Sequence, residues 1–449
     1  MSEFFGSVWW LLVTLGLLVT FHEFGHFWVA RRCGVKVLRF SVGFGKPVWS
    51  RFGRDGVEYA IGAIPLGGYV KFLDAREAEN PESAAHEPGE YNAAPVGKRM
   101  LIAVAGPVFN IVFTVFAFWA MFVVGRPDFQ PVIGAPQGLA AAAGLQDGDR
   151  ILSVDGDRVD SWSAAMLDVA QSAMLRRDAT LQVATANGQT QTRTLALSQL
   201  PQGVADNDKT FDAIGLSLQP PPAIVGVLSA GGAAEKAGLH TGDRISAING
   251  KPVASFADLV KIVPDQAKRD PRLHLTVQRG ADTLGFDLTA ERQATGGAER
   301  WLIGIGAADS HDALERYNPL RAVPAALRET WKTTSATLGM IGAMLTGAAS
   351  TKNLSSVISI AQVANASAHM GLAWFLSFLA VISLSLGILN LLPIPLLDGG
   401  HLLYYAIEWV KGSPLSERTL IAGQYVGMAA LAALMSLAFY NDILRLIAG

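Results

Sequence analysis

Four long apolar stretches dominate the pattern of hydrophobic and polar positions along the chain. The first stretch runs without a charge from Phe4 to Phe21, resumes from Phe24 to Ala30 and stops at Arg31-Arg32. The others run from about Met100 to Val124, from about Gly371 to Leu392 and from about Thr419 to Tyr440. At about 1.5 Å per residue, a helix of each length can cross a bilayer. The pattern therefore predicts a polytopic α-helical membrane protein with four transmembrane helices.

Composition supports a membrane protein. Of the 449 residues, 50% are hydrophobic and only 16% are charged, whereas soluble domains carry about a quarter charged residues. The mean hydropathy is +0.31. The net charge of -2 gives no sign of nucleic-acid binding. The first stretch lacks the basic start and small-residue cleavage site of a signal peptide. A single cysteine, Cys33, excludes an intrachain disulfide and a cysteine-based zinc site.

Basic residues predict the orientation of the spans. They are concentrated after the first span, at Arg31, Arg32, Lys36, Arg39, Lys46, Arg51, Arg54 and Lys71, and before the second, at Lys98 and Arg99. Because such residues mark cytoplasmic ends, the loop at 31–98 should be cytoplasmic. Both termini and the long middle region should then lie on the opposite side.

The middle region contains two copies of one short pattern. The first reads Ala143-Gly144-Leu145, Gly148-Asp149-Arg150-Ile151 and Val154-Asp155-Gly156; the second, 94 residues later, reads Ala237-Gly238-Leu239, Gly242-Asp243-Arg244-Ile245 and Ile248-Asn249-Gly250. Gly-Asp before an apolar strand closed by Asp-Gly or Asn-Gly predicts a hairpin. The copies resemble bacterial protease-associated PDZ domains, small α/β units expected at 127–217 and 220–308. PDZ domains take extended peptides, C-termini included, by strand addition; the alternative is spacers or gates without a peptide ligand.

The first apolar stretch contains His22-Glu23-Phe24-Gly25-His26, a pattern typical of zinc proteases. Residues four apart share a helix face, so both imidazoles can bind one metal ion and Glu23 can accept a proton from a bound water. Ionisable residues inside a membrane span are costly to insert. Three on one turn therefore indicate a functional site, against the alternative of core histidines paired with Glu23.

A third metal ligand is needed, because catalytic zinc usually takes three protein ligands and a water. The leading candidate is Asp398, in the segment Asn390-Leu391-Leu392-Pro393-Ile394-Pro395-Leu396-Leu397-Asp398-Gly399-Gly400. Its two prolines break the helix, and irregular backbone at membrane depth is tolerated where protein or a water cavity covers it. In another class of membrane zinc protease the ligand would be a downstream Glu. Glu408 is the candidate for that role, but it lacks helix-breaking neighbours.

The two motifs, in this order, resemble those of the site-2 protease family of intramembrane metalloproteases. The resemblance covers nearly the whole chain and is strongest to the family's bacterial sigma-E-regulating branch, through the span and repeat layout, Phe44-Gly45, Ile64 to Tyr69, and Gly106-Pro107-Val108-Phe109-Asn110. It implies that His22, His26 and Asp398 bind zinc, that Glu23 is the catalytic base and that Asn390 holds the substrate backbone. A helix–helix hydrogen bond is the alternative for Asn390, and we favour structural packing for His401.

The resemblance also implies the remaining organisation. Within the cytoplasmic loop, residues about 56–75 should form a membrane re-entrant β-hairpin whose Gly67-Gly68 region pairs with an unwound substrate strand; an ordinary cytoplasmic hairpin is the alternative. The spans are assigned to 1–30, 99–125, 369–398 with its motif, and 417–442, with membrane-surface helices at 309–368. Ser356-Val357 replaces the family's Gly-Pro, which should relax a turn before the third span.

The resemblance implies a function in regulated intramembrane proteolysis during the envelope stress response. The expected substrates are single-span membrane proteins trimmed outside the membrane, including an anti-sigma factor and remnant signal peptides. The PDZ-like copies would exclude substrates with large external domains. The protein should lie in the bacterial inner membrane, with the PDZ-like copies and both termini periplasmic and the active site toward the cytoplasm. A non-enzymatic scaffold that binds C-termini is the rival, and the joint presence of Glu23, both histidines and Asp398 argues against it.

Overall fold

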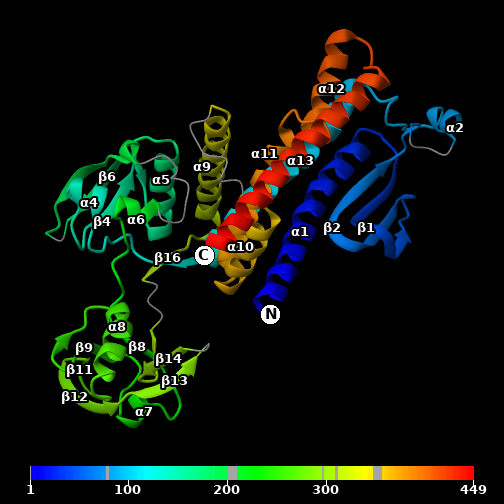
Figure 1. Cartoon of the computed structure of the whole chain (residues 1–449). Coiled ribbons are helices and arrows are strands. Elements are labelled where there is room, and N and C mark those ends of the chain that lie inside the picture. Colours follow the sequence, from blue (N-terminus) through cyan, green and yellow to red (C-terminus); the bar gives the residue numbers. More distant parts are fainter. Residues whose placement is uncertain are drawn as a thin grey trace. The chain divides into compact units, whose positions relative to one another are not determined.

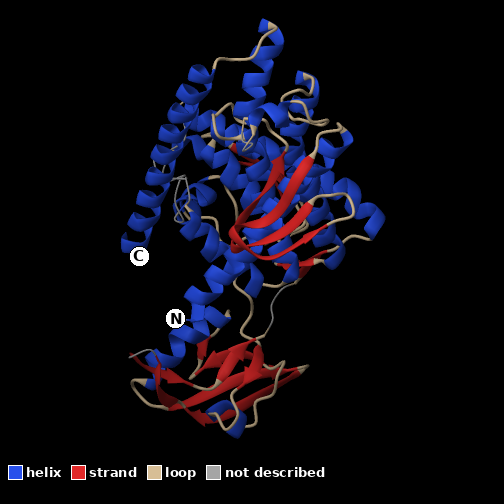
Figure 2. Ribbon diagram, turned by 90° about the vertical axis from the view of Figure 1, so that its right-hand side faces the viewer, coloured by secondary structure: helices blue, strands red, loops and turns tan. Residues whose placement is uncertain are grey.

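The computed structural model describes residues 2–76, 80–185, 187–200, 210–295, 298–308, 312–346 and 356–448. The chain divides into two compact units. The first unit comprises Met1–Arg126 and Glu315–Gly449, and the second comprises Pro127–Leu314. Figure 2 shows helices in blue and strands in red, with helices dominating the first unit. Ser356 and Val357, which replace the family's Gly-Pro, are described, but Leu354 and Ser355 just before them lie outside the described residues.

The first unit is built from long helices (Figure 1). In the described part of the chain, four helices are long and apolar enough to cross a membrane, which confirms the predicted number of spans. They are α1 (Ser2–Arg32), α3 (Val96–Val124), α11 (Leu372–Leu391) and α13 (Glu417–Ala448). The unit also contains α2 (Pro81–Ala85), α9 (Pro319–Leu345), α10 (Val357–His369) and α12 (Asp398–Lys411).

Helix α3 packs against both α1 and α11. A Cβ on Gly25 of α1 would lie 2.6 Å from the carbonyl oxygen of Ala105, so glycine permits the close approach of α1 to α3. On the α11 side, Ser383 Oγ donates to the carbonyl oxygen of Asn110 at 2.9 Å, and Thr114 Oγ donates to that of Ala380 at 3.1 Å. Such hydrogen bonds and small-residue contacts are what hold helices together in lipid. The Gly25 contact sets α1 close to α3, and the two hydrogen bonds hold α11 against α3.

Strands β1 (Val37–Phe52) and β2 (Glu58–Phe72) form an antiparallel pair beside α1 (Figure 1). Both strands are bent. Residues 37–42 pair with 68–72, and residues 39–42 also pair with 58–61 on their other side. Residues 47–52 in turn pair with 58–62. Gly43 and Gly45 in β1 and Gly67 in β2 have positive φ, which suits bends of this kind. The segment 68–72 is therefore an edge, paired on one side only among the described residues.

The third span ends where the prolines predict a break. Helix α11 ends at Leu391, and α12 begins at Asp398 after a short irregular stretch. A Cβ on Gly400 would lie 2.5 Å from the carbonyl oxygen of Ile394, so the chain folds back tightly here. The sequence predicts the break and the end of the helix, but it does not predict that a second helix, α12, starts at Asp398 itself.

The second unit contains two copies of one fold. The four-stranded sheets have the orders β5-β4-β6-β7 and β10-β9-β11-β12, which are equivalent positions in the two copies. At the predicted hairpins, Asp155 and Gly156 have φ of 51° and 91°, and Asn249 and Gly250 have φ of 50° and 75°. Positive φ at both central residues is the type I′ turn that Asp-Gly and Asn-Gly favour.

The first copy has a core around Ile151, Leu181 and Val169, and the second has one around Ile245, Leu275 and Leu259. The elements of the first copy are α4 (Gly138–Ala142), β4 (Arg150–Val154), β5 (Asp157–Arg158), α5 (Trp162–Met174), β6 (Ala179–Ala184), β7 (Thr190–Leu195), η1 (Leu197–Gln199) and α6 (Thr210–Ile214). Those of the second are β8 (Val225–Leu228), α7 (Ala233–Lys236), β9 (Arg244–Ile248), β10 (Lys251–Pro252), α8 (Phe256–Ala267), β11 (Arg272–Arg279), β12 (Asp282–Thr289), β13 (Glu291–Thr295), β14 (Ala298–Leu302) and β15 (Ile305–Ala307). Strands β3 (Arg126–Asp128) and β16 (Ala313–Glu315) pair where the chain enters and leaves the unit.

Candidate metal centre and active site

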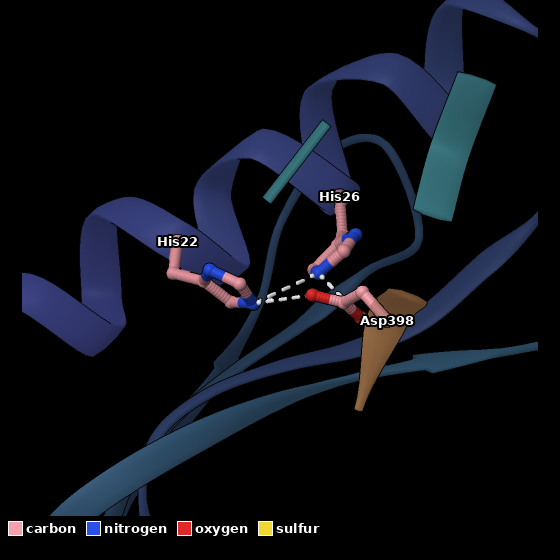
Figure 3. A group of neighbouring side chains, drawn as sticks. All are labelled: His22, His26 and Asp398. Carbon is pink, nitrogen blue, oxygen red and sulfur yellow. Dashed lines mark hydrogen bonds and ion pairs between the residues drawn. The ribbon is translucent and has the colours of Figure 1, made fainter. Parts of the chain in front are cut away.

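Three side chains that the sequence assigns to zinc converge in the first unit (Figure 3). His22 and His26 lie one turn apart on α1, and Asp398 is the first residue of α12. The two Nε2 atoms are 3.1 Å apart. Asp398 Oδ2 lies 3.1 Å from His22 Nε2, and Asp398 Oδ1 lies 3.5 Å from His26 Nε2. The fold thus brings together residues that are more than 370 positions apart.

Hydrogen bonds on the far side of each ring leave Nε2 free to bind a metal ion. The Nδ1–H of His26 donates to the carbonyl oxygen of Ile102 at 2.7 Å. Since a carbonyl only accepts, the proton of the neutral ring lies on Nδ1 and Nε2 carries a lone pair. The amide Nδ2 of the buried Asn110 lies 3.2 Å from Nδ1 of His22, and Asn110 Oδ1 has no hydrogen bond among the described residues. Turning this amide over exchanges Nδ2 and Oδ1, and Oδ1 then accepts the Nδ1–H of His22.

The arrangement fits a tetrahedral zinc ion. Ligand atoms about 2.0–2.1 Å from such an ion are about 3.3 Å apart, close to the three separations between His22, His26 and Asp398. Two imidazole lone pairs and a carboxylate facing one another repel unless a cation lies between them. Asp398 Oδ2 is buried without a hydrogen bond in the described structure, which is consistent with a metal-ligand oxygen. Three ligands leave one position open, as in catalytic zinc sites.

Gly106 of α3 borders the metal-binding nitrogens of the two histidines. A Cβ at this position would overlap His26 Nε2 and lie 2.7 Å from Nε2 and Cε1 of His22. Any larger residue would therefore occupy space that the imidazoles need. The sequence includes Gly106 and Asn110 in one motif, but without a structure it gives neither residue a role.

Glu23 lies in a cavity of about 440 Å³, which both histidines, Asp398 and Asn390 also line. The edge segment of β2 forms another wall, and a Cβ on Gly68 would lie 3.5 Å from Cγ of Glu23 and 2.6 Å from the carbonyl oxygen of Ser41. Gly67 has φ of 150°, and a Cβ there would overlap the Phe44 ring. The structure therefore places the predicted base beside the predicted substrate-binding strand.

His401 and Glu408, two further residues of α12, make contacts of their own near the site. His401 lines the cavity and stacks on Tyr405, with ring centroids 6.3 Å apart. Burial lowers the pKa of His401, which favours the neutral imidazole. Glu408, the alternative third ligand, forms an ion pair of 2.6 Å with Arg99 instead. The group of possible metal ligands that the described residues form contains Asp398 and not Glu408.

The chain is similar to known proteins over nearly its whole length. The model of Peptidase family M50 matches residues 10–434. A protein of Xylella fastidiosa (strain 9a5c) whose name includes the words zinc metalloprotease is 46% identical over 99% of this chain and 100% of its own length. The Regulator of sigma-E protease RseP is 41% identical in Salmonella typhimurium (strain 14028s / SGSC 2262) and 40% in Escherichia coli (strain K12), each over 97% of this chain and 98% of the relative. The chain therefore belongs to Peptidase family M50, the site-2 type of zinc metalloproteases.

Proposed function

We propose that this zinc metalloprotease cleaves the transmembrane segment of single-span membrane proteins, with His22, His26 and Asp398 as zinc ligands and Glu23 as catalytic base. The observation that carries the proposal is that Asp398 meets His22 and His26 of the membrane-spanning helix α1 at distances that suit zinc. A soluble protease would gain nothing from placing this group inside an apolar helix, where ionisable residues are costly. A peptide bond that reaches such a site lies within the membrane.

The chain's own residues account for binding and proton transfer. When bound, zinc supplies a Lewis acid that polarises the scissile carbonyl and acidifies the attacking water. Glu23 accepts a proton from that water as oxygen adds to the carbonyl carbon, and then donates it to the nitrogen as the C–N bond breaks. Asn390 lines the same cavity, where its amide can both donate to and accept from the substrate backbone.

The edge segment 68–72 supports binding of an extended substrate. It lines the cavity through Tyr69, Val70, Lys71 and Phe72, and among the described residues it pairs on one side only, with 37–42. An open strand edge is a template for another strand. Pairing there would hold substrate backbone next to Glu23 and unwind the helix that otherwise occupies its carbonyls. The glycines at 67 and 68 keep this edge free of side chains at that point.

Orientation and partners follow from the basic loop and from the relatives. We place the protein in the inner membrane, with the loop at 31–98 cytoplasmic and the second unit and both termini periplasmic. Because the relatives are named as regulators of sigma-E, we propose a trimmed anti-sigma factor and remnant signal peptides as substrates. The two copies of the second unit, at 127–217 and 220–308, are PDZ-like domains that act as a size filter or bind exposed C-termini.

Cleavage of a defined substrate tests the proposal. Full-length enzyme and a single-span protein are reconstituted in lipid vesicles, and the cut is located by mass spectrometry. We expect a cut inside the apolar segment, and its loss in Asp398→Ala. A cut only outside the segment, or an active Asp398→Ala, contradicts the proposed site.

The filter is tested separately. Deleting residues 128–308 should permit cleavage of an untrimmed substrate that the full chain rejects. If the deletion variant folds, cleaves the trimmed substrate and still rejects the untrimmed one, the filter role is wrong.

A further inference from the structure

A buried ion pair joins α3 to α12 at a distance from the metal ligands. Arg99 donates from Nη2 to Glu408 Oε1 at 2.6 Å and from Nη1 to Oε2 at 3.2 Å. Its Nε donates to the carbonyl oxygen of Ala94 at 3.1 Å. The Arg99 and Glu408 side chains are only 6% and 14% exposed. A two-pronged contact of this kind fixes orientation as well as distance.

Aromatic residues extend this contact toward the β1–β2 pair. The Arg99 guanidinium lies over the Tyr405 ring, 5.0 Å from its centroid. The Tyr405 hydroxyl shares a 2.9 Å hydrogen bond with that of Tyr91, whose ring stacks on Phe72 at 5.1 Å. The backbone N–H of Tyr91 donates to the carbonyl oxygen of Leu73 at 2.8 Å. One cluster therefore touches α3, α12 and the strand that borders the cavity.

The spacing along each helix connects this cluster to the metal site. Asp398, Tyr405 and Glu408 are seven and ten residues apart on α12, so they lie on one face. On α3, Arg99 and Gly106 are also seven residues apart and share a face. The two faces meet with the ion pair at one end. At the other end lie Asp398 and the glycine that borders both histidines.

Asp398 depends on this packing for its position. It is the first residue of α12, and it follows an irregular segment that folds back tightly, so α12 does not continue the line of α11. Where α12 lies, and how it is rotated, decides whether its carboxylate reaches His22 and His26. Burying an ion pair costs desolvation that the attraction often does not recover. A buried pair at this place is therefore better explained by the geometry it imposes than by stability.

We infer that Arg99, Glu408 and Tyr405 are positioning residues that hold α12 at the distance and rotation at which Asp398 completes the zinc site. The inference rests on the proposed assignment of Asp398 as a ligand. It gives Glu408 a role in zinc binding that acts through another residue. Burial raises the pKa of Tyr91, so its phenol stays protonated and keeps its hydrogen bond to Tyr405.

Zinc affinity of the purified full-length protein tests this inference, measured by competition with a chromophoric chelator. The variants are Glu408→Ala, the exchange of Arg99→Glu with Glu408→Arg, and the milder Tyr405→Phe. Glu315→Ala is the matched control, because Glu315 forms a comparable buried pair with Arg126 at 2.7 Å, and Arg126 also lies 5.0 Å from an aromatic centroid, that of Trp374. The absorption spectrum of cobalt-substituted protein reports ligand geometry independently of activity.

Glu408→Ala should bind zinc about tenfold more weakly and change the cobalt spectrum. Tyr405→Phe should change both in the same direction by less, and the charge exchange should recover part of the affinity. Glu315→Ala should keep wild-type affinity and spectrum. If Glu408→Ala does not fold, Tyr405→Phe and the exchange variant decide the question.

Two results would overturn the inference. One is wild-type zinc affinity and spectrum in the folded variants of the cluster. The other is an equal loss of affinity in the Glu315→Ala control, which would indicate general loosening of the unit. Asp398→Ala separates this failure from that of the proposed site. Wild-type zinc affinity in Asp398→Ala would reject Asp398 as a ligand, whereas lost affinity there with unaffected cluster variants would reject only the positioning role.

Discussion

Replacing Gly106 by alanine should block the zinc site with a single methyl group. The added Cβ would overlap His26 Nε2 and lie 2.7 Å from His22 Nε2, where ordinary contact begins at 3.4 Å. Either α3 or the rings must therefore move, by about 0.7 Å to clear His22 and by more to clear His26, whereas zinc ligand distances tolerate only about 0.2 Å. We expect zinc affinity to fall at least tenfold, with cleavage falling in parallel, because a displacement on this scale resembles loss of a ligand-orienting contact.

The assay compares Gly106→Ala with Gly97→Ala on the same helix. A Cβ on Gly97 would meet no atom within 4 Å, so this control adds the same methyl group to the same helix without a clash. Zinc is measured after equilibration with a chelator, and cleavage with a single-span substrate. Equal zinc affinity and cleavage in the two variants would refute the role of Gly106 as the residue that borders the site.

Three further variants test other contacts. Asn110→Leu removes the partner of His22 Nδ1 and should lower zinc affinity about 10- to 100-fold by chelator competition; unchanged affinity would contradict this. Asp442 accepts hydrogen bonds from the N–H and Oγ groups of Ser356 and Ser359 at the start of α10, so Asp442→Asn should cost about 2 kcal/mol of stability in thermal unfolding, with no change in zinc content. Arg279 holds the pKa of Asp243 below its usual range. A carboxylate with a lowered pKa stabilises the fold fully at pH above its ordinary pKa of about 3.9. This stabilisation is lost as the pH falls through the lower pKa of the folded state. Asp243→Asn should therefore flatten the acid dependence of urea unfolding of the second unit; an unchanged slope would contradict it.

Local patterns made much of the fold predictable. The four spans follow from runs of apolar residues, since length and hydropathy alone decide whether a helix can cross a bilayer. The break after Leu391 follows from Pro393 and Pro395, which cannot continue a helix. The I′ turns at 155–156 and 249–250 follow from Asp-Gly and Asn-Gly. Each of these features depends on a few neighbouring residues.

Contacts between distant segments were not predictable in the same way. In the sequence, Arg99 is a basic residue flanking the second span and Glu408 is the alternative metal ligand. Only the fold shows that they meet across 309 positions. Gly106 and Asn110 lie in an apolar helix where glycine and asparagine have several ordinary explanations. Their contacts with His22 and His26 depend on how α1 and α3 pack, which one sequence does not specify. Asp398 is predictable because it closely follows Pro393 and Pro395, which break the helix. This signal depends only on neighbouring residues.

The measurement that tests the central claim most directly compares wild-type protein with Glu23→Gln. Both are purified, their zinc is quantified, and each is incubated with a single-span substrate. Glu23 lines the cavity without belonging to the three-ligand group, so both proteins should hold about one zinc ion per chain. Only the wild type should cleave, since removing a general base costs about 10²- to 10⁴-fold in rate. Absence of zinc from the wild type, or equal cleavage by the two proteins, would contradict a zinc site formed by His22, His26 and Asp398 with Glu23 as its base.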